Sequence, residues 1–360
     1  MIKASLWKLL HRHWRNATES PAAGYTVLLP VPADLPVFLK IALGTCAAQI
    51  GTHRVETLVI PDGRSEKFEA VFNQAVAQNN AGPLRLVHLE GMDRLATRYS
   101  RSPHINHWLQ LISGLDACRS THAHLHDADA FLAPADFLEN SYETCITKGY
   151  DVTGVNQVWD DWYRKNGFEH IVATWEAAID VRWAKKFSPD QFRGQEFTIN
   201  GLSHTSDTML IPQCLTPGNR IGRVHNDRIV HFNYVICTFR HFQENARAGA
   251  KPFADDSFRV LLVRLLVNAC QSVETEQDVP SIPELEQGLT SRPARVSYSK
   301  EIARGNYAEF RVKLQQLLGV NHFDEAAKAR LLQDVSKFDA AFDWERSALH
   351  AESNLCSPAS

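Results

Sequence analysis

The chain has 360 residues, of which 44% are hydrophobic and 22% are charged, and its formal net charge is −3. This composition is typical of a globular protein that buries one large core or two smaller ones. The near balance of 38 basic and 41 acidic residues gives no broad positive field, so nucleic acid is not an expected partner.

The seven cysteines are scattered, odd in number and without a CxxC pair. This pattern argues against a disulfide framework and against a cysteine zinc site, and it favours a reducing environment. No apolar run reaches the roughly 18–20 residues that a membrane-spanning helix needs. We therefore expect a cytoplasmic protein.

Residues 1–20 are predicted to contain an amphipathic helix. The stretch MIKASLWKLLHRHWRN mixes apolar side chains such as Trp7 with basic ones such as Lys8. No uninterrupted apolar segment follows the charges, so the stretch is not typical of a signal peptide. Such a helix either packs on its own domain or makes peripheral contact with a membrane surface. Because the first sheet strand begins near Tyr25, we expect turnover not to require the helix.

Strand and helix signals alternate from residue 25 to residue 134. The apolar, β-rich runs are YTVLLPV, VETLVIP and LRLVHL, and the helical runs between them are LPVFLKIALGTCAAQI and SEKFEAVFNQAVAQ. A further helical stretch, residues 104–120, leads into a fourth strand, HAHLHDADAFL. Continuous apolar strands alternating with helices predict an α/β fold, in which a mostly parallel sheet has helices on both faces.

The pattern loosens after residue 134, and residues 21–250 are predicted to form one domain whose halves are 21–134 and 135–250. Beyond that, runs such as DDSFRVLLVRLLVNAC and DEAAKARLLQDVSKFDAAF have helical periodicity. They predict an α-helical C-terminal region over residues 251–360.

The stretch THAHLHDADAFLAP places three histidines and two aspartates at the end of the fourth strand. In an extended strand His122, His124 and His126 point to one face, and Asp127 and Asp129 point to the other. Two carboxylates at the carboxyl end of a sheet strand suit Mg²⁺ or Mn²⁺ that also carries phosphate oxygens. The alternatives are a solvated strand end for the aspartates, and either zinc ligation or hydrogen bonds between sheet and helices for the histidines.

The order of these segments resembles the nucleotide-binding half of GT-A glycosyltransferases, which belong to the nucleotide-diphospho-sugar transferases. The chain has a first strand followed by the loop PVPADLP, a second strand that ends in the acidic turn IPDGRS, and a fourth strand that ends in a DxD motif. The resemblance covers about residues 25–240. It implies a metal-dependent enzyme that moves a sugar from a nucleotide-sugar, such as a UDP- or GDP-sugar, to a hydroxyl acceptor.

On this resemblance, Asp127 and Asp129 hold Mn²⁺ or Mg²⁺ against the donor's diphosphate, and Asp127 also contacts the donor. The residues expected near the nucleoside are Pro32, Ala33, Asp34 and Asp62. Many such enzymes carry an Arg-Asn pair in the helix before DxD, but Asn106 lies too far upstream to align with it. Residues 21–134 would form the nucleotide-binding half, and residues 135–250 the acceptor half.

Three further residues complete the candidate site. Asp207, in SHTSDTMLIP, resembles the family's acidic residue before the acceptor-site helix and is the first candidate for general base, with helix capping as the alternative. Glu176 is a second carboxylate for base duty or acceptor binding. His231 resembles the late histidine that many GT-A enzymes use as a third metal ligand, although a packed core histidine beside Phe232 would give the same pattern.

Three other functions remain open. A sugar nucleotidyltransferase shares the fold and the metal, but it usually carries a Gly-rich loop with basic residues after the first strand, and PVPADLP contains neither. A metal-dependent hydrolase would use the cluster of His122, His124 and His126. A non-catalytic, partner-binding domain of the same fold would have its DxD aspartates salt-bridged or facing helices.

Overall fold

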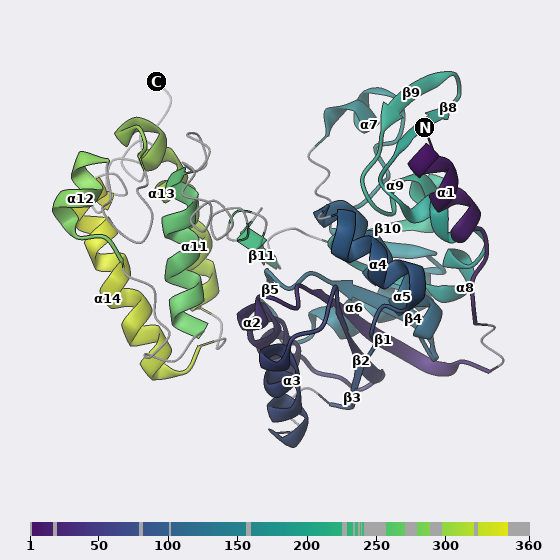
Figure 1. Ribbon diagram of the computed structural model, residues 1–360, viewed down its shortest axis with the longest axis horizontal. Helices are drawn as coiled ribbons and strands as arrows, with labels where there is room; N and C mark the ends of the chain where they lie inside the picture. Colours follow the sequence, from purple (N-terminus) through teal and green to yellow (C-terminus); the bar gives the residue numbers. More distant parts are fainter. Residues whose placement is uncertain are drawn as a thin grey trace, which may run out of the picture. The chain divides into compact units, whose positions relative to one another are not determined.

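The computed structural model divides into two compact units, Met1–Val230 and His231–Ser360 (Figure 1). This division falls before the predicted domain boundary at residue 250, which lies outside the described residues. The structure describes residues 2–16, 20–78, 82–100, 102–155, 160–224, 229–232, 235–236, 238, 240, 257–270, 279–288, 297–319 and 323–344.

The first unit contains a seven-stranded sheet made of β1 (Ala22–Val31), β2 (Arg54–Pro61), β3 (Leu84–Leu86), β4 (Ser120–His126), β6 (Val152–Val155), β7 (Glu176–Asp180) and β10 (Ile221–Val224). Their order across the sheet is β10-β6-β7-β4-β1-β2-β3. Every neighbouring pair is parallel except those of β7, which runs antiparallel to both β4 and β6. The predicted α/β class with a mostly parallel sheet is confirmed.

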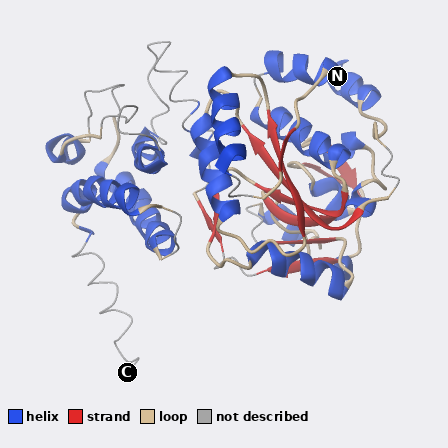
Figure 2. Ribbon diagram, turned by 90° about the horizontal axis from the view of Figure 1, so that it is seen from below, coloured by secondary structure: helices blue, strands red, loops and turns tan. Residues whose placement is uncertain are grey.

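Helices cover both faces of this sheet (Figure 2). Helix α5 (Pro103–Ala117) packs on one face, where Trp108 shares a buried core with Leu28 and Leu125. Helix α6 (Phe137–Lys148) packs on the other face, where the ring of Phe137 lies 6.2 Å from that of His124. Strand β1 is buried on both faces and is nearly continuously apolar, as an inner parallel strand is expected to be, whereas the buried strand β4 alternates histidines with Ala123 and Leu125.

Smaller elements complete the first unit. Strand β5 (Ala130–Leu132) pairs with β11 (Ile229–His231), and β8 (Glu196–Ile199) pairs with β9 (Leu202–Thr205). The hairpin between β8 and β9 turns through Asn200 and Gly201, which both have positive φ angles, as a tight two-residue turn requires. The other helices are α1 (Ile2–Leu10), α2 (Pro36–Ala47), α3 (Glu66–Gln78), α4 (Gly91–Ser100), α7 (Asp161–Lys165), α8 (Val181–Ala184) and α9 (Leu210–Cys214), with 3-10 turns at Pro189–Phe192 and Gly218–Arg220.

The N-terminal helix α1 and the segment after it pack against the first unit. The ring of Trp7 meets Trp108 of α5 edge-on at 5.6 Å, and the ring of His11 lies 4.8 Å from Trp108. The indole N–H of Trp14 donates to the carbonyl of Phe187 at 2.9 Å. Of the two roles expected for this helix, packing on its own domain is therefore the one that these contacts support. Leu9 remains 72% exposed.

The second unit is α-helical, as the periodicity predicts. Its helices are α11 (Ser257–Cys270), α12 (Ile282–Gln287), α13 (Lys300–Leu318) and α14 (Glu325–Phe342). Asp324 caps α14 by accepting a hydrogen bond from the backbone N–H of Ala327 at 2.7 Å. The buried rings of Phe258, Tyr307 and Phe338 pack together in its core.

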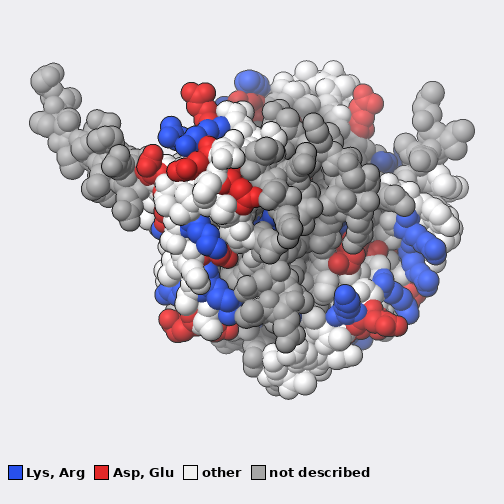
Figure 3. All heavy atoms as spheres, turned by 60° about the vertical axis from the view of Figure 1, so that its left-hand side comes forward, with Lys and Arg blue, Asp and Glu red and all other residues white. Residues whose placement is uncertain are grey.

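On the face drawn in Figure 3, the described basic and acidic side chains are interspersed. Within the described part of the chain, no helix combines the length and the apolar character that crossing a membrane requires.

Candidate active site

Asp62, at the carboxyl end of β2, ties three elements together. Its Oδ1 accepts a hydrogen bond from the backbone N–H of Ala33 at 2.9 Å, and its Oδ2 accepts one from the side-chain amide of Asn106 at 2.8 Å. The loop after β1, the end of β2 and the start of α5 therefore meet at this carboxylate. Pro32 and Ala33 are buried in the loop, and Asp34 is exposed. Asn106 therefore holds the carboxylate of Asp62, a residue of the predicted nucleoside site. The sequence did not assign this role to Asn106, because Asn106 does not align with the family's Arg-Asn pair.

The two aspartates of the DxD motif lie in the turn directly after β4. The backbone N–H of Asp127 donates to the carbonyl of Trp175 at 3.0 Å, and the N–H of Ala130 donates to the carbonyl of Asp127 at 3.1 Å. These bonds tie the turn to the start of β7. The carboxylate of Asp127 keeps 25% of its surface exposed, whereas Asp129 as a whole is 7% exposed.

Asp127 and Asp129 form a group with His231. One ligand atom from each of the three side chains lies within 4.8 Å of the others. His231 is the last residue of β11, which pairs with β5, the short strand that begins at Ala130 directly after the DxD turn. The three predicted metal ligands are therefore neighbours, although they are distant in the sequence.

Helix α5 contributes two histidines that the sequence analysis did not single out. The Nε2 atom of His107 lies 3.2 Å from Oδ1 of Asp127, and Nδ1 of His104 lies 3.7 Å from Oδ1 of Asp207. The spacing of three residues at the start of the helix, in HINH, places both rings on one face. This spacing, in a helix that precedes a strand ending in two aspartates, is the sequence pattern from which the two histidines could have been predicted.

These imidazoles and carboxylates shift one another's proton affinity. Burial lowers the pKa of His107, but the charge of Asp127 and its hydrogen bond, with further charge from Asp207 and Asp129, raise it above the usual value overall. The interaction with Asp207 raises the pKa of His104, against a smaller effect of burial.

Asp207 is not the N-cap of the helix that follows it. Helix α9 begins at Leu210, and Met209 occupies the N-cap position without a side-chain cap bond. The carboxylate of Asp207 accepts a hydrogen bond from the N–H of Thr208 at 2.7 Å. Burial raises its pKa, but the hydrogen bonds from His104 and Thr208, with the imidazole charges nearby, lower that pKa overall. The capping alternative is not supported, and Asp207 belongs to the group of titratable side chains at the start of α5.

Glu176 is sealed inside the sheet. Its Oε1 accepts from Nε2 of His124 and its Oε2 from Nδ1 of His126, both at 2.6 Å, and the residue is 1% exposed. Burial raises the pKa of Glu176, but the charges and hydrogen bonds of the two histidines lower it overall. This burial leaves no surface for an acceptor, so direct contact with substrate, expected from the sequence, does not fit the geometry.

The histidines of β4 contact residues of helix α6 and of the neighbouring strand β7. His122 lies against Tyr142 of α6, with ring centroids 5.2 Å apart, and His124 and His126 are fully buried beside Glu176. Among the described residues, two groups of three side chains have ligand atoms close enough to share a metal ion. Neither group contains His122, His124 or His126. The arrangement gives no support to the zinc-hydrolase alternative and fits histidines that hold sheet and helix together.

Comparison with known proteins gives matches among solved structures. No family model and no curated protein matches the sequence. Solved structures of glycosyltransferases are among the structural matches. The mannosyltransferase PcManGT from Pyrobaculum calidifontis, in complex with GDP-Man and Mn²⁺, matches with a TM-score of 0.43 and 15% identity, covering 95% of this chain and 88% of its own.

Two other solved structures match with similar TM-scores. S. aureus TarS 1-349 has a TM-score of 0.39 and 11% identity, covering 90% of this chain and 92% of its own. The galactosyltransferase LgtC, in complex with donor and acceptor sugar analogs, has a TM-score of 0.40 and 13% identity, covering 56% of this chain and 74% of its own. At these identities and TM-scores the matches assign no roles to individual residues, which have to be argued from the site itself.

Proposed function

We propose that this chain is a metal-dependent glycosyltransferase that moves a sugar from a nucleotide-sugar donor to a hydroxyl acceptor. The observation that carries the proposal is the group formed by Asp127, Asp129 and His231 at the carboxyl end of β4. In open α/β sheets, ligands bind outside the carboxyl ends of the strands. Asp62 and Asp207 lie at the same edge, each in a hydrogen-bonded setting.

The ligand types fit a divalent cation that binds oxygen and tolerates nitrogen. Two carboxylates and one imidazole suit Mn²⁺ better than Mg²⁺, which prefers oxygen ligands alone. Bound there, the ion would neutralise the negative charge that develops on the leaving diphosphate. His107 supports this role, because its contact with Asp127 orients that carboxylate from the side of α5.

The nucleoside is assigned to the loop after β1. Asp62 is held by the N–H of Ala33 and by Asn106, so the loop has a fixed position beside the start of α5. The exposed Asp34 offers a carboxylate to ribose hydroxyls from this loop. Preorganisation of this kind lowers the entropy cost of binding a donor.

Asp207 is our candidate for the general base. Its lowered pKa keeps the carboxylate ionised at neutral pH, which base duty requires, although the same pairing weakens its affinity for the acceptor's proton. In this proposal Glu176 does not contact the substrate and acts through neighbouring residues. It follows Trp175, whose carbonyl accepts from Asp127, and it holds His126, which directly precedes Asp127. We assign Glu176 to positioning of the DxD turn.

A specific observation favours a second candidate, a partner-binding domain without catalysis. Such a domain would have a salt-bridged DxD motif, and Asp127 does contact His107. Metal binding separates the two candidates, because only the transferase needs Asp129, whose side chain is outside that contact.

The deciding experiment is a calorimetric titration of UDP-, GDP- and CDP-sugars with and without Mn²⁺, followed by a transfer or donor-hydrolysis assay with the nucleotide that binds. We expect Mn²⁺-dependent binding that Asp129→Ala weakens strongly. The matched control is Asp161→Ala on α7, an exposed aspartate that forms only surface ion pairs. Equal binding by both variants, or no binding by the unmodified protein, would remove the proposal.

A further inference from the structure

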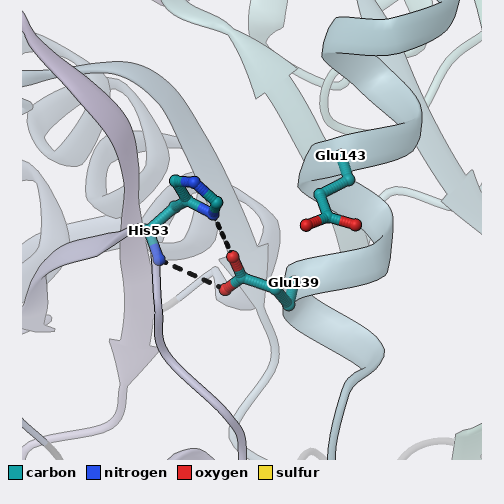
Figure 4. A group of neighbouring side chains, drawn as sticks. All are labelled: His53, Glu139 and Glu143. Atoms are coloured by element: carbon teal, nitrogen blue, oxygen red, sulfur yellow. Dashed lines mark hydrogen bonds and ion pairs between the residues drawn. The ribbon is translucent and has the colours of Figure 1, made fainter.

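A second group of metal-binding side chains lies at the opposite edge of the sheet from the DxD turn. His53 directly precedes β2, whereas Asp127 follows the parallel strand β4. Glu139 and Glu143 are four residues apart on α6, so they share one face of that helix. One ligand atom from each of His53, Glu139 and Glu143 lies within 4.8 Å of the others. Figure 4 shows Glu139 directed toward the imidazole and Glu143 one turn along the same helix.

Glu139 is the fixed member of this group. Its side chain is 8% exposed, and its Oε1 contacts the ring Nδ1 of His53. Its Oε2 accepts hydrogen bonds from the hydroxyl of Tyr25 at 3.3 Å and from the backbone N–H of His53 at 3.4 Å. A carboxylate oriented in this way by outer hydrogen bonds is typical of metal ligands.

Glu143 supplies the second carboxylate from the solvent side. It is exposed, one turn along from Glu139, and like charges with this spacing destabilise a helix by a few tenths of a kcal/mol. Arg54, the residue directly after His53, donates to the carbonyl of Cys46 at 2.8 Å, on α2. A cation between the two carboxylates would remove their repulsion.

We propose that His53, Glu139 and Glu143 form a structural binding site for a divalent transition-metal ion, with Zn²⁺ the best match. One imidazole nitrogen and two carboxylate oxygens are ligands that zinc accepts, and the exposed side of His53 leaves room for water as a fourth ligand. The bound ion links the start of β2 to α6. Because it lies at the amino ends of the parallel strands, its role is to stabilise the fold, and it does not depend on the proposed transfer activity.

The test is a calorimetric Zn²⁺ titration of the full-length chain that carries Asp129→Ala, which disables the group at the DxD turn. We expect one Zn²⁺ per chain and a rise in the melting temperature. Adding His53→Ala or Glu143→Gln should weaken the binding at least about tenfold. The matched control is Glu66→Gln, since Glu66 is an exposed glutamate on α3.

Two results would overturn the site. One is the absence of saturable Zn²⁺ binding by the Asp129→Ala protein. The other is Zn²⁺ binding that persists unchanged in both His53→Ala and Glu143→Gln. If His53→Ala lowers the melting temperature before metal is added, Glu143→Gln decides alone, because an exposed glutamate can be replaced without loss of the fold.

Discussion

At the scale of single residues, the most informative change is Asp207→Asn. Asparagine keeps the shape and the hydrogen bond from the N–H of Thr208, but it cannot take a proton. If Asp207 is the base, the transfer rate should fall at least about a hundredfold while donor and metal affinities stay normal. Steady-state kinetics and calorimetry on one preparation measure both. Transfer close to the unmodified rate would instead indicate a mechanism without a base at this position.

The pairing of Asp207 with His104 adds a pH dependence. The base works only when it is ionised, so activity is lost as pH falls through its pKa, and this pKa lies below the usual range. In His104→Gln the main interaction that lowers it is gone, so the pKa rises. We expect the acid limb of the kcat/KM profile to move to higher pH in this variant. An acid limb that does not move would exclude Asp207 as the group that the profile reports.

Glu176→Gln tests the buried contacts of β7 with β4. The carboxylate accepts from His124 and His126 at 2.6 Å, and removing the charge from such a buried pair costs about 3–5 kcal/mol of unfolding free energy. The folded-state pKa of Glu176 is lowered, so its stabilising effect is present at neutral pH and is lost as pH falls below about 4.3, the usual glutamate value.

Urea denaturation of Glu176→Gln at pH 7 and near pH 4 measures this effect. The difference in stability between variant and unmodified protein should shrink toward the acid end. A difference that stays constant with pH would mean that packing, and not charge, makes Glu176 important.

At the scale of the elements, the N-terminal helix changes an expectation. The sequence predicts that turnover does not require residues 1–20, but Trp7 and His11 cover Trp108 of α5, the helix that also carries His104. A chain that starts at Pro21 would expose this part of the core. We therefore expect Trp7→Ala to lower the unfolding free energy by about 1–3 kcal/mol, because part of a large apolar side chain loses its buried contacts.

Leu9→Ser is the matched control for this helix, since Leu9 is 72% exposed and should change stability by less than about 0.5 kcal/mol. Thermal denaturation of both variants checks the comparison. Equal effects would show that α1 contributes through its overall composition and not through the contact with α5.

The sequence predicts the parallel part of the sheet because strands that are buried on both faces appear in it as apolar runs. The second halves of β1 and β2, VLLPV and LVIP, are continuous apolar runs, and turn residues separate the strands from their helices. The sequence does not predict that β7 lies between β4 and β6 and runs antiparallel to them. A short buried strand such as EAAID has the same composition in either direction.

The candidate site was predictable to the same extent. Three of its residues, Asp62, Asp127 and Asp129, follow the ends of predicted strands. The neighbouring residues in the sequence therefore indicate where these carboxylates lie. The partners of the site residues depend on tertiary packing. Nothing local to Asn106 indicates that it donates to Asp62, and nothing local to Glu176 indicates that two histidines of β4 occupy its oxygens.

At the scale of the whole molecule, the division into Met1–Val230 and His231–Ser360 predicts how ligands affect unfolding. Each unit is compact by itself, so the two are expected to unfold in two calorimetric transitions. Donor contacts are assigned to the first unit, at Asp62 and the DxD turn, and the third proposed metal ligand, His231, ends strand β11, which pairs with β5 of that unit. Mn²⁺ with the nucleoside diphosphate at about 100 times its Kd should add about 2.7 kcal/mol to the stability of the unit that binds it.

Differential scanning calorimetry should therefore show one transition that rises with Mn²⁺ and nucleotide and one that does not. The Asp129→Ala variant provides the assignment, because it should abolish the shift of the first transition and leave the second unchanged. A single transition that moves as a whole would mean that the two units unfold cooperatively. In that case ligand binding at the DxD turn would stabilise the helical unit as well, and truncation of α13 and α14 would be expected to weaken the binding of the donor.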